Sequence, residues 1–256
     1  MPIVAVSGDT ATTTGVALAA SWPAEGGARL IEADPSGGDL AAWFDLPESP
    51  SLSTLVTRLR DRSSAELEAH LRPVGDGLRV VTCPAMPSEA DLAVSEAAAI
   101  LVPMLRDDTC WSIVDIGRRD PCHHPFGSGA EVIVMVHRQA TQSARAAAVR
   151  LRRLPDLVAQ ARSAAPRVVV AVVGRRPFDF VEIEGFLAAS VAGAGGDDLT
   201  VVGLADDPLA AAVLGGRSGV SGRRLARLPL MRTARTLAGA VLSAPARPRS
   251  VGARWR

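Results

Sequence analysis

The sequence contains no lysine, no asparagine and no tyrosine, so all 28 of its basic residues are arginines. Its many Ala, Arg, Gly and Pro residues indicate a compositionally biased genome, and such a bias explains why arginine replaces lysine on a protein surface. Bias explains less well the loss of a lysine on which chemistry depends. A site that normally requires lysine must therefore work differently in this chain or not work at all.

Strong charge and long apolar runs are missing as well. The formal net charge is +1, so overall charge favours neither nucleic acid nor a membrane surface as a partner. No run approaches the roughly 18 uncharged apolar residues of a membrane span, and the N-terminus does not resemble a signal sequence. Three sparse cysteines argue against a disulfide framework and for a reducing compartment. We therefore expect a soluble, cytoplasmic protein without a specific nucleic-acid partner.

Several catalytic motifs are absent. No G-x-G-x-x-G follows an expected strand, which disfavours a dinucleotide dehydrogenase, and no G-x-S-x-G elbow of a hydrolase occurs. A zinc site built from Cys122, His123 and His124, with Asp120 or Cys83, is an alternative to test. It has weak support, because no C-x-x-C pair is present and adjacent histidines rarely bind one ion.

Short apolar runs alternate with helical stretches along the 256 residues, of which 48% are hydrophobic. The runs are continuous rather than alternating, as in a parallel sheet covered on both faces. This order predicts a doubly wound α/β fold, with a mostly parallel sheet between two layers of helices. We expect one domain over residues 1–242 and a flexible basic tail over residues 243–256. The expected strands are residues 3–6, 29–33, 78–82, 111–115, 131–136, 168–173 and 199–204. The expected helices are residues 13–21, 38–44, 52–60, 89–105, 141–161, 180–191, 208–214 and 229–242.

The first expected strand is followed by the loop SGDTATTT, residues 7–14. A helix starting near Thr12 or Thr13 would direct its free N–H groups and positive dipole end at this loop, which favours an anion such as phosphate. A plain strand-to-helix turn with a threonine N-cap would have a similar sequence. By itself the loop therefore leaves both interpretations open.

Acidic residues follow two other expected strands. Asp34 comes at the end of the second, two residues after Glu32, and Asp115 ends the fourth. A carboxylate at such a strand end is suited to bind Mg²⁺, often through water, or to orient an attacking water. Alternatively, Asp34 lies in a solvated turn with Asp39 capping the next helix, and Asp115 forms a structural ion pair with the arginines that follow it.

Together these segments resemble the MinD/ParA family of deviant P-loop ATPases over roughly residues 2–242. The resemblance rests on the order and spacing of the segments, and the run E-x-D-P-x-G-G-D is its most specific part. Actinobacterial MinD-like proteins are similar, as are, more loosely, the septum-site and CpaE/TadZ-like pilus-assembly branches. The segments are IVAVSGDTATTTGVALAASW, RLIEADPSGGDLAAWF, CWSIVDIG, AEVIVMVHRQATQSARAAAVRLRRL and VVGLADDPLAAAVLGG.

The resemblance implies that ATP and Mg²⁺ bind at residues 7–14. The family's loop reads K-G-G-x-G-K-[ST]-[ST], so Thr13 would match its Mg²⁺-binding hydroxyl, Asp34 its catalytic aspartate and Asp115 its Walker B aspartate. The implied metal-binding residues are thus Thr13, Asp34 and Asp115. An asparagine that contacts adenine in the family would fall at Gly174. The implied nucleotide-binding residues are Ser7, Gly8, Asp9, Thr10, Ala11, Thr12, Thr13 and Thr14.

The departures from the family pattern concern the charge of the loop. Ser7 and Thr12 replace its two lysines, and Asp9 replaces a glycine with a carboxylate that would repel phosphate. A cation in the lysine's role contributes factors of about 10³–10⁵ in rate, so we expect a degenerate site without efficient ATP hydrolysis. An active, atypical Mg-ATPase would need an arginine in the site, for which Arg118 and Arg119 are candidates. A scaffold that binds no nucleotide is the third hypothesis.

The resemblance also implies partners. These are proteins of the division machinery or of pilus or secretion assembly, a nucleotide-dependent homodimer, and peripheral contact with the inner face of the membrane. The apolar face of residues 229–242 is expected to pack on the domain rather than enter a membrane. The arginines of the tail would bind an anionic surface only weakly.

Overall fold

The computed structural model describes residues 3–23, 27–59, 64–75, 77–139, 143–191, 199–217 and 222–243. Apart from Ser243, the expected tail therefore lies outside the described residues, and its flexibility and surface binding stay predictions.

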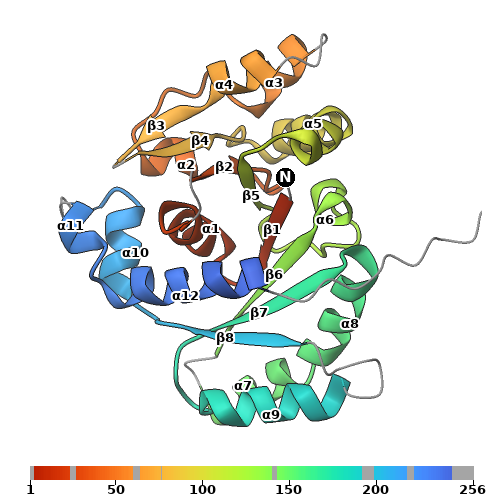
Figure 1. Ribbon diagram of the computed structural model, residues 1–256, viewed down its shortest axis with the longest axis vertical. Helices are drawn as coiled ribbons and strands as arrows, with labels where there is room; N and C mark the ends of the chain where they lie inside the picture. The colour runs from red at the N-terminus through yellow and green to blue at the C-terminus, as the bar shows by residue number, and fades with distance from the viewer. Residues whose placement is uncertain are drawn as a thin grey trace, which may run out of the picture.

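Within the described residues the strands form one eight-stranded sheet in the order β3-β4-β2-β5-β1-β6-β7-β8. Every neighbouring pair is parallel except β3 and β4, which run antiparallel at one edge. Figure 1 shows β1 near the middle of this sheet. The strands are β1 (Ile3–Gly8), β2 (Ala28–Glu32), β3 (Arg72–Val74), β4 (Leu78–Val81), β5 (Trp111–Asp115), β6 (Val132–Arg138), β7 (Arg167–Val173) and β8 (Thr200–Leu204).

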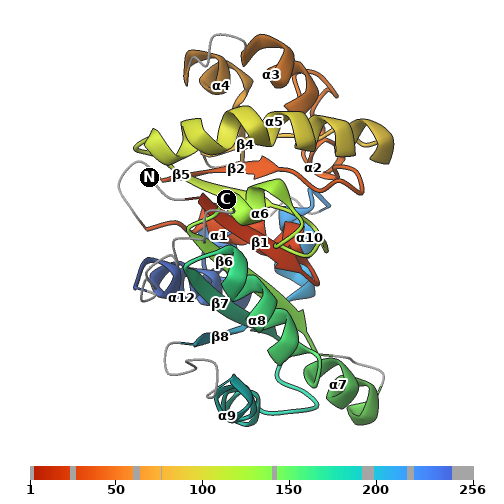
Figure 2. The same cartoon turned by 90° about the vertical axis from the view of Figure 1, so that its right-hand side faces the viewer.

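Helices cover both faces of the sheet. One buried core lies between the sheet and α1, α10 and α12, and a second lies between the sheet and α3, α5, α6, α8 and α9 (Figures 1 and 2). This is the three-layer α/β arrangement that the sequence predicts. The helices are α1 (Ala11–Ala20), α2 (Leu40–Trp43), α3 (Leu52–Arg58), α4 (Ser64–His70), α5 (Pro87–Asp107), α6 (Pro125–Gly129), α7 (Ala144–Leu151), α8 (Leu154–Ala164), α9 (Phe180–Val191), α10 (Pro208–Leu214), α11 (Gly222–Leu225) and α12 (Pro229–Ser243).

Successive residues of the central strands are buried on opposite faces of the sheet. In β1, Ile3 and Ala5 belong to one core, whereas Val4 and Val6 belong to the other. A strand buried on both faces cannot alternate apolar with polar residues, which is why these strands are continuous apolar runs.

All seven expected strands are present, with ends shifted by two residues or fewer. The expected helix over residues 141–161 is instead two helices, α7 and α8, which meet at Arg152 and Arg153. Pro155 explains the break, because its ring collides with the carbonyl of residue 151 in a continuous helix. Helix α1 begins at Ala11, slightly before the expected Thr12 or Thr13. The sequence analysis did not predict β3, α4, α6 or α11.

The apolar face of α12 packs on the domain, as expected. Its apolar side chains contact β8 and α1 and are at most 5% exposed. These side chains are Leu230, Met231, Ala234, Leu237, Ala238 and Val241. A search of the described helices for one that could span a bilayer gave none.

Candidate functional site

The carboxyl ends of the parallel strands meet at one edge of the sheet, where ligands bind in open α/β folds. The order of the strands in the sheet reverses at β1, because β5 and β2 lie on one side of β1 and β6 and β7 lie on the other. The loops after β1, β2, β5, β6 and β8 therefore converge at this edge. They contain the residues that the sequence analysis selected.

The loop after β1 is held tightly against its neighbours. Gly8 has φ +115°, and a Cβ there would lie 2.2 Å from the carbonyl oxygen of Val136, so a side chain is excluded. The Ser7 hydroxyl donates to the carbonyl of Arg119 at 2.7 Å, and the Gly8 N–H donates to Gly117 at 2.9 Å. Ser7 thus ties the β1 loop to the β5 loop.

Thr10 is the N-cap of α1, but it adopts a left-handed conformation with φ 57° and its side chain does not cap the helix. The threonine N-cap of a plain turn is therefore not what is observed. The first N–H groups of α1 point toward the loop and are suited to bind an anion.

The Asp9 carboxylate is surrounded by positive groups. It forms an ion pair with Arg150 of α7, lies 4.0 Å from Nη2 of Arg118, and accepts a weak hydrogen bond from the backbone N–H of Arg138 at 3.4 Å. Arg118 therefore reaches the loop, as the hypothesis of an atypical ATPase requires. Arg150 had no sequence motif to mark it, because it is 141 residues from Asp9 along the chain.

Glu32 is buried and organises the loop after β2. One carboxylate oxygen accepts the N–H groups of Asp39 at 2.7 Å and Leu40 at 2.9 Å, and the other accepts the N–H of Cys83 at 2.9 Å. Burial raises the pKa of Glu32 to about 7 although these hydrogen bonds lower it. Asp39 occupies the N-cap position of α2, but its side chain makes no capping bond. The carboxylate of Glu32 satisfies these N–H groups instead.

The geometry of Gly38 explains part of the run E-x-D-P-x-G-G-D. A Cβ on Gly38 would lie 2.5 Å from the Glu32 carboxylate and 2.5 Å from the Cys83 carbonyl. Glycine at this position lets the loop close over Glu32.

Asp34 lies beside the β5 loop. Its Oδ1 accepts the N–H of Ser36 at 2.8 Å, and a Cβ on Gly117 would lie 2.1 Å from its carboxylate. Gly117 has φ +62°, so both its conformation and its neighbour require glycine. Asp34 is half-buried at the same edge as Asp115.

Asp115 is fully buried. Its Oδ1 accepts the N–H of Gly117 at 3.0 Å, whereas its Oδ2 has no hydrogen-bond partner within the described part of the chain. Burial raises the pKa of Asp115 to about 6, the Thr12 hydroxyl and Gly117 lower it, and the charge of Asp34 adds to the rise. The alternative of a structural ion pair is not seen, because no described arginine pairs with Asp115.

The threonine hydroxyls at the start of α1 face two different surroundings, Asp115 and a cavity. Thr12 interacts with Asp115, whereas Thr10, Thr13 and Thr14 line a cavity of about 290 Å³. Thr13 as the metal-binding hydroxyl stays a prediction, whereas the hydroxyl that interacts with Asp115 is that of Thr12. Without a lysine the sequence had no marker to fix this register.

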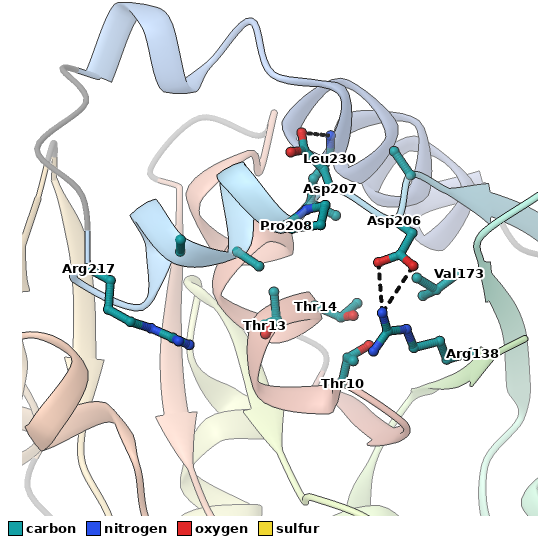
Figure 3. Close-up of a pocket in the computed structure, with 13 residues that line it drawn as sticks. Thr10, Thr13, Thr14, Arg138, Val173, Asp206, Asp207, Pro208, Arg217 and Leu230 are labelled. Carbon is teal, nitrogen blue, oxygen red and sulfur yellow. Dashed lines mark hydrogen bonds and ion pairs between the residues drawn. The ribbon is translucent and has the colours of Figure 1, made fainter. Parts of the chain in front are cut away.

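Opposite the threonines, the cavity is bordered by the loop after β8 (Figure 3). Asp206 accepts hydrogen bonds from Arg138 through both oxygens, at 3.0 and 3.1 Å. Asp207 caps α10 through the N–H of Ala210 and also accepts the N–H of Leu230. Arg217 lies at the outer rim. The sequence analysis did not select these residues.

Gly174, the expected position of an asparagine, follows β7, and a Cβ there would lie 4.0 Å from the Cβ of Asp206. An amide side chain is nevertheless present nearby. Gln139, buried at the end of β6, donates to the carbonyl oxygens of Gly174 at 2.9 Å and Phe178 at 3.0 Å. It therefore fixes the loop after β7, a role that the sequence does not reveal.

The candidate zinc ligands do not gather. His124 donates from Nε2 to the Ala33 carbonyl at 2.9 Å, His123 pairs with Asp120 at 2.9 Å, and the Cys122 thiol contacts the Gln160 carbonyl. Burial lowers the pKa of His124 to about 4, so this ring is neutral at pH 7. Among the described residues no three or more His, Cys, Asp or Glu side chains gather closely enough to hold a metal ion, so the zinc hypothesis is wrong for them.

No protein-family model and no curated protein sequence matches the chain. Solved structures match over nearly the whole length. A ParA family ATPase from Chlorobium tepidum TLS is 15% identical, with a TM-score of 0.66, 93% of this chain and 97% of that chain covered. The cell division ATPase MinD from Pyrococcus furiosus is 12% identical, with a TM-score of 0.65 over 95% and 99%.

The septum site-determining protein MinD from Pyrococcus horikoshii OT3, complexed with Mg-ADP, is 9% identical, with a TM-score of 0.62 over 94% and 96% of the two chains. At these identities the likeness shows the fold and not the site. The chain therefore has the α/β fold of the ParA and MinD ATPases.

Proposed function

We propose that the edge around Asp115 binds ATP with Mg²⁺, and that the protein is a MinD/ParA-like positioning or regulatory protein. The observation that carries the proposal is the buried Oδ2 of Asp115, which lacks a partner among the described residues, on a carboxylate that also interacts with the Thr12 hydroxyl of α1. A carboxylate oxygen is costly to bury without a partner. A cation or a cation-bound water would remove this cost.

The residues present fit a magnesium ion. Mg²⁺ prefers carboxylate and hydroxyl oxygens and keeps several waters, and Asp115, Asp34 and a threonine of α1 offer these oxygens. When bound, the ion would neutralise charge on the phosphate oxygens. The cavity beside Thr10, Thr13 and Thr14 would receive the rest of the nucleotide. A MinD structure with the same fold holds Mg-ADP, which supports this choice of ligand.

Fast hydrolysis is not part of the proposal. The loop offers no lysine, and the guanidinium groups nearest to it are bound to Asp9. Asp34 would orient a water, but a water alone leaves the developing phosphate charge without the cation that the family uses. We therefore propose that nucleotide occupancy, rather than turnover, controls the protein.

The protein would act by binding partners. We propose protein partners of septum placement or of pilus or secretion assembly, a homodimer, and action in the cytoplasm with peripheral contact at the inner face of the membrane. The fold shared with ParA and the cell division ATPase MinD supports this class of role.

Fluorescence titration with a labelled ATP analogue and Mg²⁺, combined with a phosphate-release assay, tests the proposal. We expect saturable, Mg²⁺-dependent binding that Asp115→Asn weakens at least tenfold, with no turnover above background. Asp91→Asn, an exposed substitution on α5, is the control and should leave binding unchanged. Absence of binding and of a thermal shift at millimolar Mg-ATP would instead support a scaffold that binds no nucleotide.

An active, atypical Mg-ATPase is the second candidate, favoured by the proximity of Arg118 to the loop. It requires robust phosphate release that Asp34→Ala abolishes and Arg118→Ala strongly reduces. That result would overturn the degenerate site and leave the nucleotide site itself in place.

A further inference from the structure

Arginines from separate elements converge on the loop after β1. Arg118 follows β5, Arg138 ends β6, and Arg150 lies in the last turn of α7. Arg150 and Arg118 face the Asp9 carboxylate, whereas the guanidinium of Arg138 is turned across the cavity to Asp206 (Figure 3). The loop that lost its lysines is therefore still surrounded by positive charge.

The charges at Asp9 do not balance. One carboxylate faces the guanidinium groups of Arg118 and Arg150, and Arg138 contributes only its backbone N–H because Asp206 engages its side chain. His137 adds no charge at pH 7, since burial and the nearby Arg150 hold its pKa below the usual value. The cluster thus carries an excess of about one positive charge beside the N-terminus of α1.

Asp9 is also less exposed than the arginines it holds. Its side chain is 20% exposed, against 44% for Arg150 and 82% for Arg118. The carboxylate thus holds the guanidinium of Arg150 through a hydrogen bond and attracts that of Arg118 across 4.0 Å, close to the loop. Guanidinium groups bind carboxylate and phosphate oxygens with the same donor geometry.

We propose that Asp9 is an internal substitute for a phosphate group. It holds Arg150 and Arg118 at the loop, and the polyphosphate of a nucleotide displaces it and takes over these arginines. This inference rests on the proposed function, because it names residues that bind the phosphate chain at that same site. Asp9 therefore acts as a competitor of the ligand, and the arginines act as specificity-determining residues for the phosphate chain.

The proposal makes opposite predictions for neighbouring residues. Asp9→Asn removes the competing charge while its amide oxygen still accepts the Arg138 N–H, so Mg-ATP should bind about two- to fivefold more tightly. Arg150→Gln should weaken binding by a similar factor of about two to five. Arg152→Gln, an exposed change one residue beyond α7, is the matched control and should shift affinity less than about twofold.

Isothermal titration calorimetry with Mg-ATP on the full chain measures these affinities, with circular dichroism to verify folding. Tighter binding to Asp9→Asn alone supports the inference even where Arg150→Gln does not fold. Wild-type binding that Asp9→Asn leaves unchanged or weakens would overturn the inference and leave the proposed function standing. If neither the wild type nor Asp9→Asn binds at millimolar Mg-ATP, both are wrong.

Discussion

Glu32 and Asp115 face each other in register on the neighbouring strands β2 and β5, and both are buried. Both oxygens of Glu32 accept backbone N–H groups, from Asp39, Leu40 and Cys83. Asp115 accepts the N–H of Gly117 through Oδ1 and interacts with the Thr12 hydroxyl, but its Oδ2 is unpartnered among the residues that the structure describes. The two carboxylates at this edge of the sheet therefore differ in their hydrogen bonding, because only Glu32 has described partners for both of its oxygens.

The difference separates a structural acid from a functional one. Burial raises the pKa of both, of Glu32 to about 7 and of Asp115 to about 6, so each resists ionisation. For Glu32 the hydrogen bonds order the loop that carries Asp34. The unpartnered Oδ2 of Asp115 lowers the stability of the folded protein. Such a cost is expected at a position where a ligand binds.

Glu32→Ala should have the largest effect on folding. It removes the acceptor for the buried N–H groups of Leu40 and Cys83 and for the part-buried N–H of Asp39, and should lower the free energy of unfolding by about 3–5 kcal/mol. Urea denaturation followed by circular dichroism measures the loss. Glu184→Ala, an exposed change on α9, is the control and should cost less than about 0.5 kcal/mol. A similarly small loss of stability for Glu32→Ala would show that Glu32 is not a structural residue.

Asp115→Asn should act in the opposite direction on stability. Its oxygen keeps the bond to Gly117, while its amide group replaces the charged Oδ2 beside Asp34. At pH 8 without Mg²⁺ the variant should therefore be more stable by about 1–3 kcal/mol. Millimolar Mg²⁺ with ATP should raise the melting temperature of the wild type and not that of the variant. Destabilisation of the variant at pH 8 would make Asp115 a structural residue like Glu32.

The fold could be predicted from the sequence because its strands are buried on both faces and therefore stand out as continuous apolar runs. The strand that was missed, β3, has three residues, includes Pro73 and lies at the sheet edge, where pairing constrains sequence least. Helices α4 and α6 are short and carry no long apolar periodicity.

Only the part of the site that lies directly at the ends of the strands could be predicted from the sequence. Asp34 and Asp115 meet at the expected edge because parallel strands place their carboxyl ends together. The surroundings of Asp9 could not be predicted, since Arg150 comes from a distant helix whose docking depends on tertiary packing. The role of Glu32 was also hidden, because its partners are backbone groups that leave no mark on the sequence.

Gly117→Ala tests how closely the β2 and β5 loops fit. The residue has φ +62°, and its Cβ would meet the Asp34 carboxylate. We expect a loss of about 1–2 kcal/mol from the left-handed backbone, together with displacement of Asp34. Gly27→Ala is a matched control, because Gly27 has φ +68° and no described atom within 4 Å of its Cβ. Equal losses of stability, measured by urea denaturation, would show that Asp34 does not press on this glycine.

Asp34→Asn should have the smallest effect and a diagnostic pH dependence. The folded pKa of Asp115, about 6, lies above its ordinary value of 3.8, so its protonation favours folding below pH 4 and this contribution is lost as the pH rises to 6. Removing the Asp34 charge lowers the pKa of Asp115 and reduces that loss. Without Mg²⁺ the variant should therefore be more stable than the wild type at pH 8, by less than about 0.5 kcal/mol, and nearly equal at pH 4. In an Asp115→Asn background the gain at pH 8 should vanish in thermal melts, and its persistence there would assign it to another carboxylate.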